Sequence, residues 1–248
     1  MMGIVGHNGY MGVDAEEHRA TAYSLRMACL LGAAGGYLDA FTFLGHGGVF
    51  ANAQTGNVVM LGVYGATRQW RQALRHLPPL AAFIAGVFVA ETLGLPRMER
   101  LVLHRPVRAS LIVEIVVLAV IAALPRDFPS FGIVVAVAFV AAVQVTTFRR
   151  LRRWSVATAI TTGNLRTATI GLYQALVTRK PGAAEQSRCF YAVVLCFLVG
   201  AAAGALVTEA WHNVACCVPA AVLLLSLGLF VYDEARAADP AEEQVISE

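Results

Sequence analysis

The sequence is poor in charged residues. Asp, Glu, Lys and Arg together make up 14% of the 248 residues, whereas hydrophobic residues make up 58%. A soluble domain usually carries about 25% charged residues. This composition excludes an ordinary soluble globular domain. The formal net charge of +3 is small and its basic residues lie in short loops, so nucleic acid is not an expected partner.

Several signatures of chemistry are also missing. The five cysteines have no metal-ligand spacing and lie in or beside apolar stretches, which is typical of small buried hydrophobic residues. The chain has no nucleophile elbow, phosphate-binding loop or cofactor motif. We therefore expect no cofactor, no metal ion and no enzymatic activity.

What the chain has is apolar runs, six of them close to the length of about 20 residues that a membrane helix needs. They cover residues 27–45, 78–95, 107–124, 131–148, 190–210 and 214–232. This pattern predicts an all-α polytopic membrane bundle with six spanning helices, in a single transmembrane domain at 21–235. Residues 1–20 lack the apolar core of a signal peptide and are expected to be disordered, as is the acidic tail at 236–248.

The two halves of the chain resemble each other. Four segments recur in the same order, and the offset between copies rises smoothly from 105 to 118 residues: 39–43 with 144–148, 55–57 with 162–164, 62–64 with 171–173, and 85–86 with 203–204. Insertions in loops would produce such a drift. We predict one repeat at about 25–125 and a second at about 130–232, with chance convergence of small residues as the alternative.

The distribution of basic residues predicts the topology. If the two segments around 55–57 and 162–164 do not cross the membrane, fourteen Lys and Arg lie inside, four lie outside and Arg166 lies within it. If both segments cross, the division is ten and eight. Positive loops stay in the cytoplasm, so the first arrangement is preferred. Each half then has three spans, which makes the repeats inverted and both termini cytoplasmic.

The recurring motif is Thr55-Gly56-Asn57 in the first half and Thr162-Gly163-Asn164 in the second. Matched interruptions in the two halves of a transporter mark a solute site near the midplane. We expect the glycines to break the helices, and the hydroxyl and amide groups to cap a half-helix or face a ligand. Half-helix N-termini favour anions. The alternative is that these residues only cap and pack the break.

Charged residues inside apolar runs are costly and usually functional. Asp39 lies in the first run and Arg166 follows the second motif, so an ion pair between them is expected, either structural or coupled to a proton or solute. Glu114 is a candidate proton site, or it points to a neighbour in the bundle. The candidate binding residues are Asp39, Asn52, Gln54, Thr55, Gly56, Asn57, Gln144, Thr162, Gly163, Asn164 and Arg166.

The segments GYLDAFTF at 36–43 and VFANAQTGN at 49–57 resemble the YoaK family, small bacterial inner-membrane proteins of unknown function. The resemblance extends over roughly residues 20–235, and the later TTGNLR segment at 161–166 fits it as well. It implies a multi-pass helical protein of the bacterial cytoplasmic membrane. It implies no substrate, catalytic residue or cofactor.

These features favour a small transporter or channel for a small polar solute, with an anion suggested by Arg166 and the half-helix ends. The expected partners are the lipid bilayer and this solute, and assembly as a homo-oligomer is left open. The alternative is a membrane assembly or signalling protein that transports nothing and whose polar breaks are structural. An intramembrane enzyme is the least favoured class, because no nucleophile and base can be paired.

Overall fold

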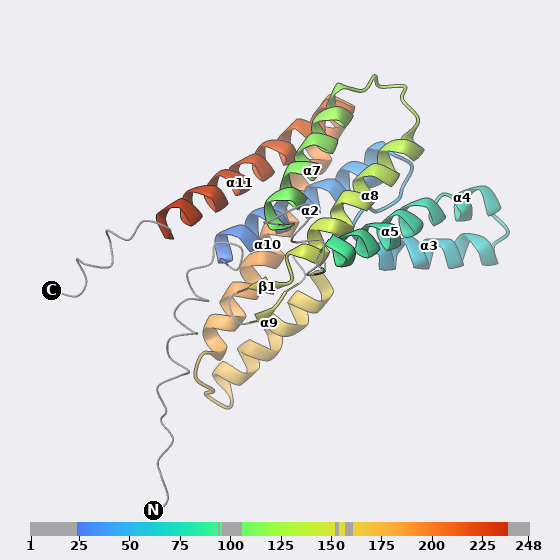
Figure 1. Cartoon of the computed structure of the whole chain (residues 1–248). Helices are drawn as coiled ribbons and strands as arrows, with labels where there is room; N and C mark the ends of the chain where they lie inside the picture. The colour runs from blue at the N-terminus through green and yellow to red at the C-terminus, as the bar shows by residue number, and fades with distance from the viewer. Residues whose placement is uncertain (1–23, 94, 96–105, 152–153, 157–160, 238–248) are drawn as a thin grey trace, which may run out of the picture.

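The computed structural model describes residues 24–93, 95, 106–151, 154–156 and 161–237, which are helical almost throughout (Figure 1). The predicted disordered lead and most of the acidic tail lie outside this range. The helices are α2 (Leu25–Gly45), α3 (Gln54–Ala66), α4 (Trp70–Leu74), α5 (Leu77–Leu93), α7 (Pro106–Ala123), α8 (Ser130–Thr147), α9 (Thr161–Leu176), α10 (Ala183–Trp211), η2 (His212–Cys216) and α11 (Cys217–Ala237). A short antiparallel pair, β1 (Arg150–Leu151) and β2 (Trp154–Ser155), precedes α9.

Four stretches of the described chain are long and apolar enough to cross a membrane: Leu25–Gly45, Trp70–Leu93, Ser130–Thr147 and Ala183–Ala235. The last contains α10 and α11, which η2 separates at a bend where His212 has a φ of 51°. The predicted all-α class is confirmed, and these helices are compatible with a membrane protein. Each of the six apolar runs falls on a helix, and the run at 107–124 coincides with α7.

The two Thr-Gly-Asn motifs lie in the first turns of α3 and α9. Gly56 and Gly163 are themselves helical, so the expected breaks at these two glycines are wrong. In the first half the non-helical segment comes before the motif, at 46–53. It begins with Gly47 and Gly48, whose φ angles of 91° and 76° suit glycine because it has no Cβ. The chain leaves α2 there and can then start α3.

The closest helix contact is between α2 and α10. A Cβ at Gly36 would lie 2.0 Å from the carbonyl oxygen of Phe197, and a Cβ at Gly200 would lie 2.0 Å from the carbonyl oxygen of Ala33. Gly204 meets the backbone of Tyr37 in the same way. Small residues let membrane helices approach this closely, and the backbones then pack directly against each other. Only glycine is compatible with this distance.

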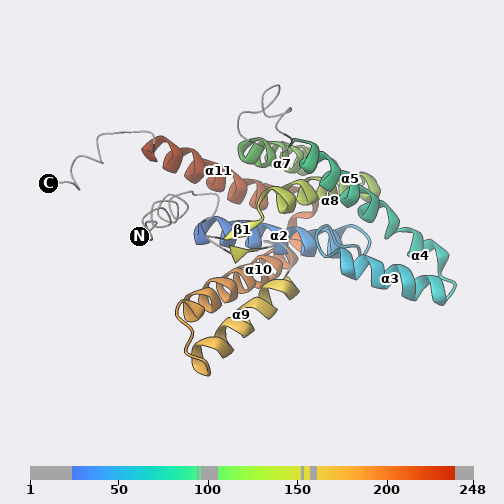
Figure 2. The ribbon, with the colours of Figure 1, turned by 60° about the horizontal axis from the view of Figure 1, so that its bottom comes forward.

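The remaining helices pack around this pair. α8 packs along α5, where Gly86 meets Phe139 and Ala142, α9 lies along α10, and α11 packs against α7. A core cluster joins α2, α7, α8 and α11. Figures 1 and 2 show the α9–α10 pair and the group of α3, α4 and α5 on different sides of α2. These two projecting groups carry the two motif helices.

We predict that Gly200→Ala lowers the free energy of unfolding by about 1–3 kcal/mol or more, because the added methyl group overlaps a backbone carbonyl that cannot move aside. Gly228→Ala is the matched control. A Cβ there meets no described atom within 4 Å, and alanine favours a helix by about 1 kcal/mol over glycine. Denaturant titration of the purified proteins in detergent measures both. Equal stability of the two variants would contradict the close α2–α10 contact.

Candidate functional site

A cavity of about 520 Å³ lies where the two motif helices begin. We call it the motif cavity. Its walls come from α2, the segment at 50–53, α3, α5, α9 and α10. The lining residues are Asp39, Ala40, Phe43, Leu44, Phe50, Asn52, Ala53, Gln54, Thr55, Phe83, Thr161, Thr162, Phe197 and Ala201. The structure thus brings five of the predicted site residues, from both halves of the chain, to one space.

Asp39 holds the start of α3 against α2. Its Oδ1 accepts hydrogen bonds from the backbone N–H of Asn52 at 2.7 Å and of Ala53 at 3.4 Å. The side-chain amide of Asn52 donates to the carbonyl of Gly35 at 3.1 Å. A carboxylate at this place compensates the partial positive charge of the helix start. The N–H groups ahead of α3 are therefore occupied by a residue of the protein itself.

Two polar atoms at the motif cavity have no hydrogen-bond partner among the described residues. They are Oδ2 of Asp39 and Oδ1 of Asn52. Asp39 is 5% exposed and Asn52 is 2% exposed, so both side chains lie almost completely inside the protein. A buried acceptor without a donor costs about 1–3 kcal/mol. Both atoms are acceptors, so a ligand that satisfies them has to supply hydrogen-bond donors.

Asn57 is committed to the loop rather than to the cavity. Its Nδ2 donates to the carbonyl of Phe50 at 2.7 Å and to Oε1 of Gln54 at 2.8 Å. Its Oδ1 accepts from the N–H of Phe50 at 3.0 Å and lies 3.2 Å from Nδ1 of His76. Both amide hydrogens are used and the residue is fully buried. Asn57 thus fixes the segment that precedes α3, which agrees with the capping alternative for this residue.

Gly56 provides the space for one aromatic wall. A Cβ at Gly56 would lie 2.7 Å from the ring of Phe50, and that ring stacks on Phe43 with centroids 4.8 Å apart. Phe83 of α5 and Phe197 of α10 also line the cavity. These aromatic residues are not among the site residues predicted from the sequence. A signal was present, since Phe43 and Phe50 lie within the segments that carry the family resemblance.

The second motif contributes differently. Thr162 lines the cavity, whereas Asn164 is buried in α9. Arg166 is exposed and forms no ion pair with Asp39 among the described residues, so the predicted Asp39–Arg166 pair is wrong. The reason is that Asp39 turns toward the N–H groups of 52–53, while Arg166 lies on the outer face of its helix. The expected preference for an anion is based on Arg166 and on the half-helix ends, and the position of Arg166 removes the first of these two arguments.

Gln144 and Glu114 form a separate polar pair. The amide of Gln144 donates to Oε2 of Glu114 at 2.7 Å, and both residues are 1% exposed. Neither lines the motif cavity. Oε1 of Glu114 has no hydrogen-bond partner among the described residues. The polar side chain of Gln144 is therefore bonded to a carboxyl group on α7 and does not face the motif cavity. Gln144 is also the neighbour in the bundle toward which Glu114 points.

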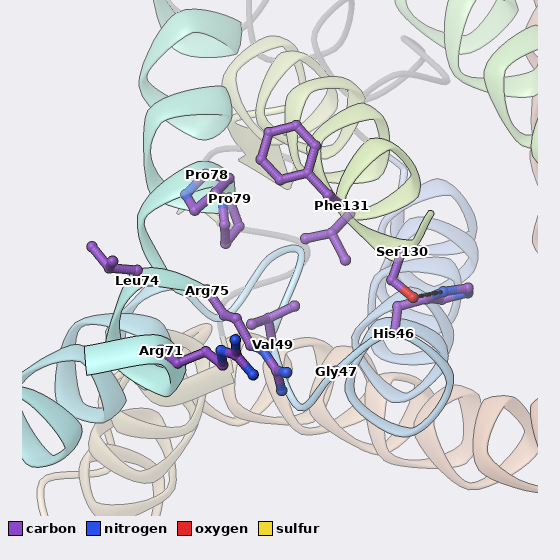
Figure 3. Close-up of a pocket in the computed structure, with 11 residues that line it drawn as sticks. His46, Gly47, Val49, Arg71, Leu74, Arg75, Pro78, Pro79, Ser130 and Phe131 are labelled. Carbon is purple, nitrogen blue, oxygen red and sulfur yellow. Dashed lines mark hydrogen bonds between the residues drawn. The ribbon is translucent and has the colours of Figure 1, made fainter. Parts of the chain in front are cut away.

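A second cavity, of about 480 Å³, is lined by the first part of the segment at 46–53 together with residues of α4, α5 and α8. Figure 3 shows Arg71 and Arg75 near Val49, with Ser130 and His46 opposite them. Nδ1 of His46 lies 3.4 Å from Oγ of Ser130. Burial, with a smaller contribution from the charge of His212, lowers the pKa of His46 to about 4, so its ring is neutral at neutral pH. The charge of this space comes from two exposed arginines, whose attraction for an anion is screened by solvent.

The fold and the site define a helical protein with apolar, membrane-type helices and one polar, aromatic-lined cavity between its two halves. The chain belongs to the DUF1275 family of proteins of unknown function, whose family model matches residues 27–229. No curated protein and no solved structure matches the chain.

We predict that alanine has unequal effects at the two motif glycines. Gly56→Ala displaces the Phe50 ring from Phe43 and lowers the free energy of unfolding by about 1 kcal/mol or more. Gly163→Ala is the matched control, because a Cβ there meets no described atom within 4 Å and alanine favours the helix. Thermal unfolding in detergent measures the difference. A loss at Gly163 as large as that at Gly56 would show that both glycines serve the same backbone role.

Proposed function

We propose that the protein is a small membrane transporter or channel that moves a small polar solute through the motif cavity. The observation that supports this most is the composition of the cavity wall. It combines residues from both motif helices, which are 107 positions apart in the chain, with one buried carboxyl group and four phenylalanines. Ligand sites are concave and mostly apolar, with a few well-placed polar groups. Ionisable residues within membrane helices usually mark solute or ion pathways.

The proposed architecture has two inverted repeats, α2–α7 and α8–α11, with six spanning helices. Matched packing supports it. α2 packs on α10, the long helix that comes after the second motif helix. α8 packs on α5, the first long helix that comes after the first motif helix. Gly204 on Tyr37 and Gly86 on Phe139 and Ala142 are the corresponding close contacts. α3 has 13 residues and α9 has 16, both shorter than a bilayer requires. In transporters built this way, the solute site lies between the repeats.

The proposed location is the bacterial cytoplasmic membrane, as the resemblance to the YoaK family implies. The proposal includes no enzymatic activity and no nucleic-acid partner, and self-association remains open. The rival class is a membrane assembly or signalling protein, in which the cavity would be a packing defect. The meeting of both motif helices at a cavity that contains a carboxyl group favours transport, because ionisable residues within membrane helices usually mark solute or ion pathways.

We predict that position 150 and both termini face the cytoplasm, because this arrangement gives the larger excess of basic residues inside. A single cysteine at 150, in a background with the five native cysteines replaced, is protected from a membrane-impermeant thiol reagent in intact cells and reacts after lysis. Arg105, for which the sequence predicts the same side, lies outside the described residues and serves as a second labelling position. A cysteine at Arg71, expected outside, is the positive control. Strong labelling of 150 in intact cells would overturn six spans.

We predict that filling the cavity stops transport. Ala201 of α10 lines the cavity, whereas its neighbour Ala202 is exposed on another face of the same helix. Ala201→Phe should reduce solute flux into liposomes at least tenfold, and Ala202→Phe should leave it unchanged. A panel of amines, amino acids, carboxylates and sugars, with and without a pH gradient, identifies the solute. If no member of a broad panel crosses at a rate above that of empty liposomes, or if both variants behave alike, the rival class is favoured.

A further inference from the structure

We propose that the motif cavity recognises a protonated amino group, so that its ligand is a small organic cation or an amine-bearing zwitterion and not a simple anion. This inference rests on the proposed function, since it names the chemical class of the solute for the same cavity. Asp39 is the anionic partner of the amino group in this arrangement. The phenylalanines surround the organic part.

The charge at the motif cavity favours a cation. Among the described residues that line it, Asp39 is the only charged one, and none is Lys, Arg or His. A carboxylate in a space bounded by apolar side chains attracts a cation more strongly than it would in water. An anion placed in the same space would face Asp39 without a compensating positive charge.

The hydrogen-bonding groups at the motif cavity also favour an amino group. The unpartnered atoms at the cavity, Oδ2 of Asp39 and Oδ1 of Asn52, both accept. Their residues are more than nine-tenths buried. An ammonium group has three donors and no acceptor, so it suits a cavity whose unpartnered side-chain atoms are acceptors. A carboxylate or a phosphate would leave both acceptors unpartnered.

The start of α3 offers little to an anion. A free helix start would favour an anion. Here the N–H groups of Asn52 and Ala53, which precede the helix, donate to Oδ1 of Asp39. The N–H groups of Gln54 and Gly56 in the first turn donate to backbone carbonyls at 2.8 Å, so most of this helix start is already hydrogen-bonded within the protein. At the start of α9, Thr161 and Thr162 line the cavity, and a threonine hydroxyl can donate to the carboxylate of a zwitterion. The amino group is the feature that a simple amine and a zwitterion share.

The phenylalanines of the cavity wall favour an organic cation over a metal ion. Phe43, Phe50, Phe83 and Phe197 come from four separate parts of the chain and line one space of about 520 Å³. Cations bind over aromatic faces with about 0.5–2 kcal/mol. A bare sodium ion would instead need about six oxygen ligands, and it would leave most of this volume empty. The wall therefore fits an organic cation better than a metal ion.

Four probes of similar size separate the alternatives: propylammonium, alanine, propionate and 1-propanol. Isothermal titration of the full-length protein in detergent, at constant ionic strength, measures binding. We expect propylammonium, alanine or both to bind, and propionate and propanol to bind at least tenfold more weakly. Tighter binding of propionate or of propanol overturns the inference. So does binding of sodium ions alone, or of no probe at all.

Two pairs of variants test the assigned groups. Asp39→Asn keeps an oxygen for the N–H groups of 52–53 but removes the charge, and should weaken amine binding roughly tenfold or more. Glu209→Gln removes an exposed carboxylate from α10 and should change nothing. Phe83→Leu should weaken binding about two- to fivefold, whereas Phe88→Leu on the exposed face of α5 should not. Unchanged amine affinity in folded Asp39→Asn protein overturns the inference.

If the Asp39→Asn protein does not fold, Asp39→Glu is used as the test variant, because it keeps the charge on a longer side chain. Its affinity for the amine should fall while its preference for the amine over propionate persists, and loss of that preference overturns the inference. Flux in liposomes separates the two proposals. If propionate or propanol crosses and Ala201→Phe blocks it, the transport function stands and the amine inference fails. If propylammonium binds through Asp39 but nothing crosses, the amine site stands and transport fails.

Discussion

A chain segment that is neither helix nor strand has to satisfy its backbone polar groups, and inside a membrane protein no bulk water is present to do so. The segment at 46–53 meets this requirement with side chains. Asp39 accepts from the N–H groups of Asn52 and Ala53, and Asn57 binds both the N–H and the carbonyl of Phe50. These bonds join α2, the segment and α3 into one unit. The position of Phe50, and with it one wall of the motif cavity, depends on them.

The dual position of Asp39 links this structural role to the proposed chemistry. One carboxylate oxygen supports the backbone ahead of α3, and the other is buried with no hydrogen-bond partner among the described residues. A ligand that binds the second oxygen would therefore act on the same carboxyl group that holds the start of α3. Ligand binding and the position of α3 would be coupled through a single side chain, which is the type of connection that a transporter or gated channel requires.

The close approach of α2 and α10 sets the frame in which this happens. With Gly36, Gly200 and Gly204 at the contact, the two backbones touch, and Asp39 of α2 comes to face the same space as Ala201 of α10. A larger residue at any of these glycines would separate the helices. The cavity consequently owes its second-half wall to packing by small residues, which by itself carries no chemical specificity.

Much of the architecture could be predicted from residue patterns, because hydrophobic run length depends only on the thickness of the bilayer. All six predicted runs fall on helices, and Thr55 and Thr162, one residue from each motif, line the same cavity. The helix breaks at Gly56 and Gly163 were placed wrongly. Glycine permits an irregular backbone without requiring it, and here Gly56 serves instead to admit the Phe50 ring.

The sequence by itself determined that the chain is an apolar helical bundle whose few polar residues recur in two halves, since composition and spacing are local properties. Only the tertiary structure decided which of these residues meet. Asp39 and Arg166 have suitable charges, but a helix presents each side chain in one direction only, and Arg166 points outward. Gln144 corresponds to Asp39 in the proposed repeat, but it meets Glu114 of α7. The aromatic wall combines Phe43 and Phe50 with Phe83 and Phe197 from two distant helices, and no local pattern can reveal an arrangement that arises from helix packing.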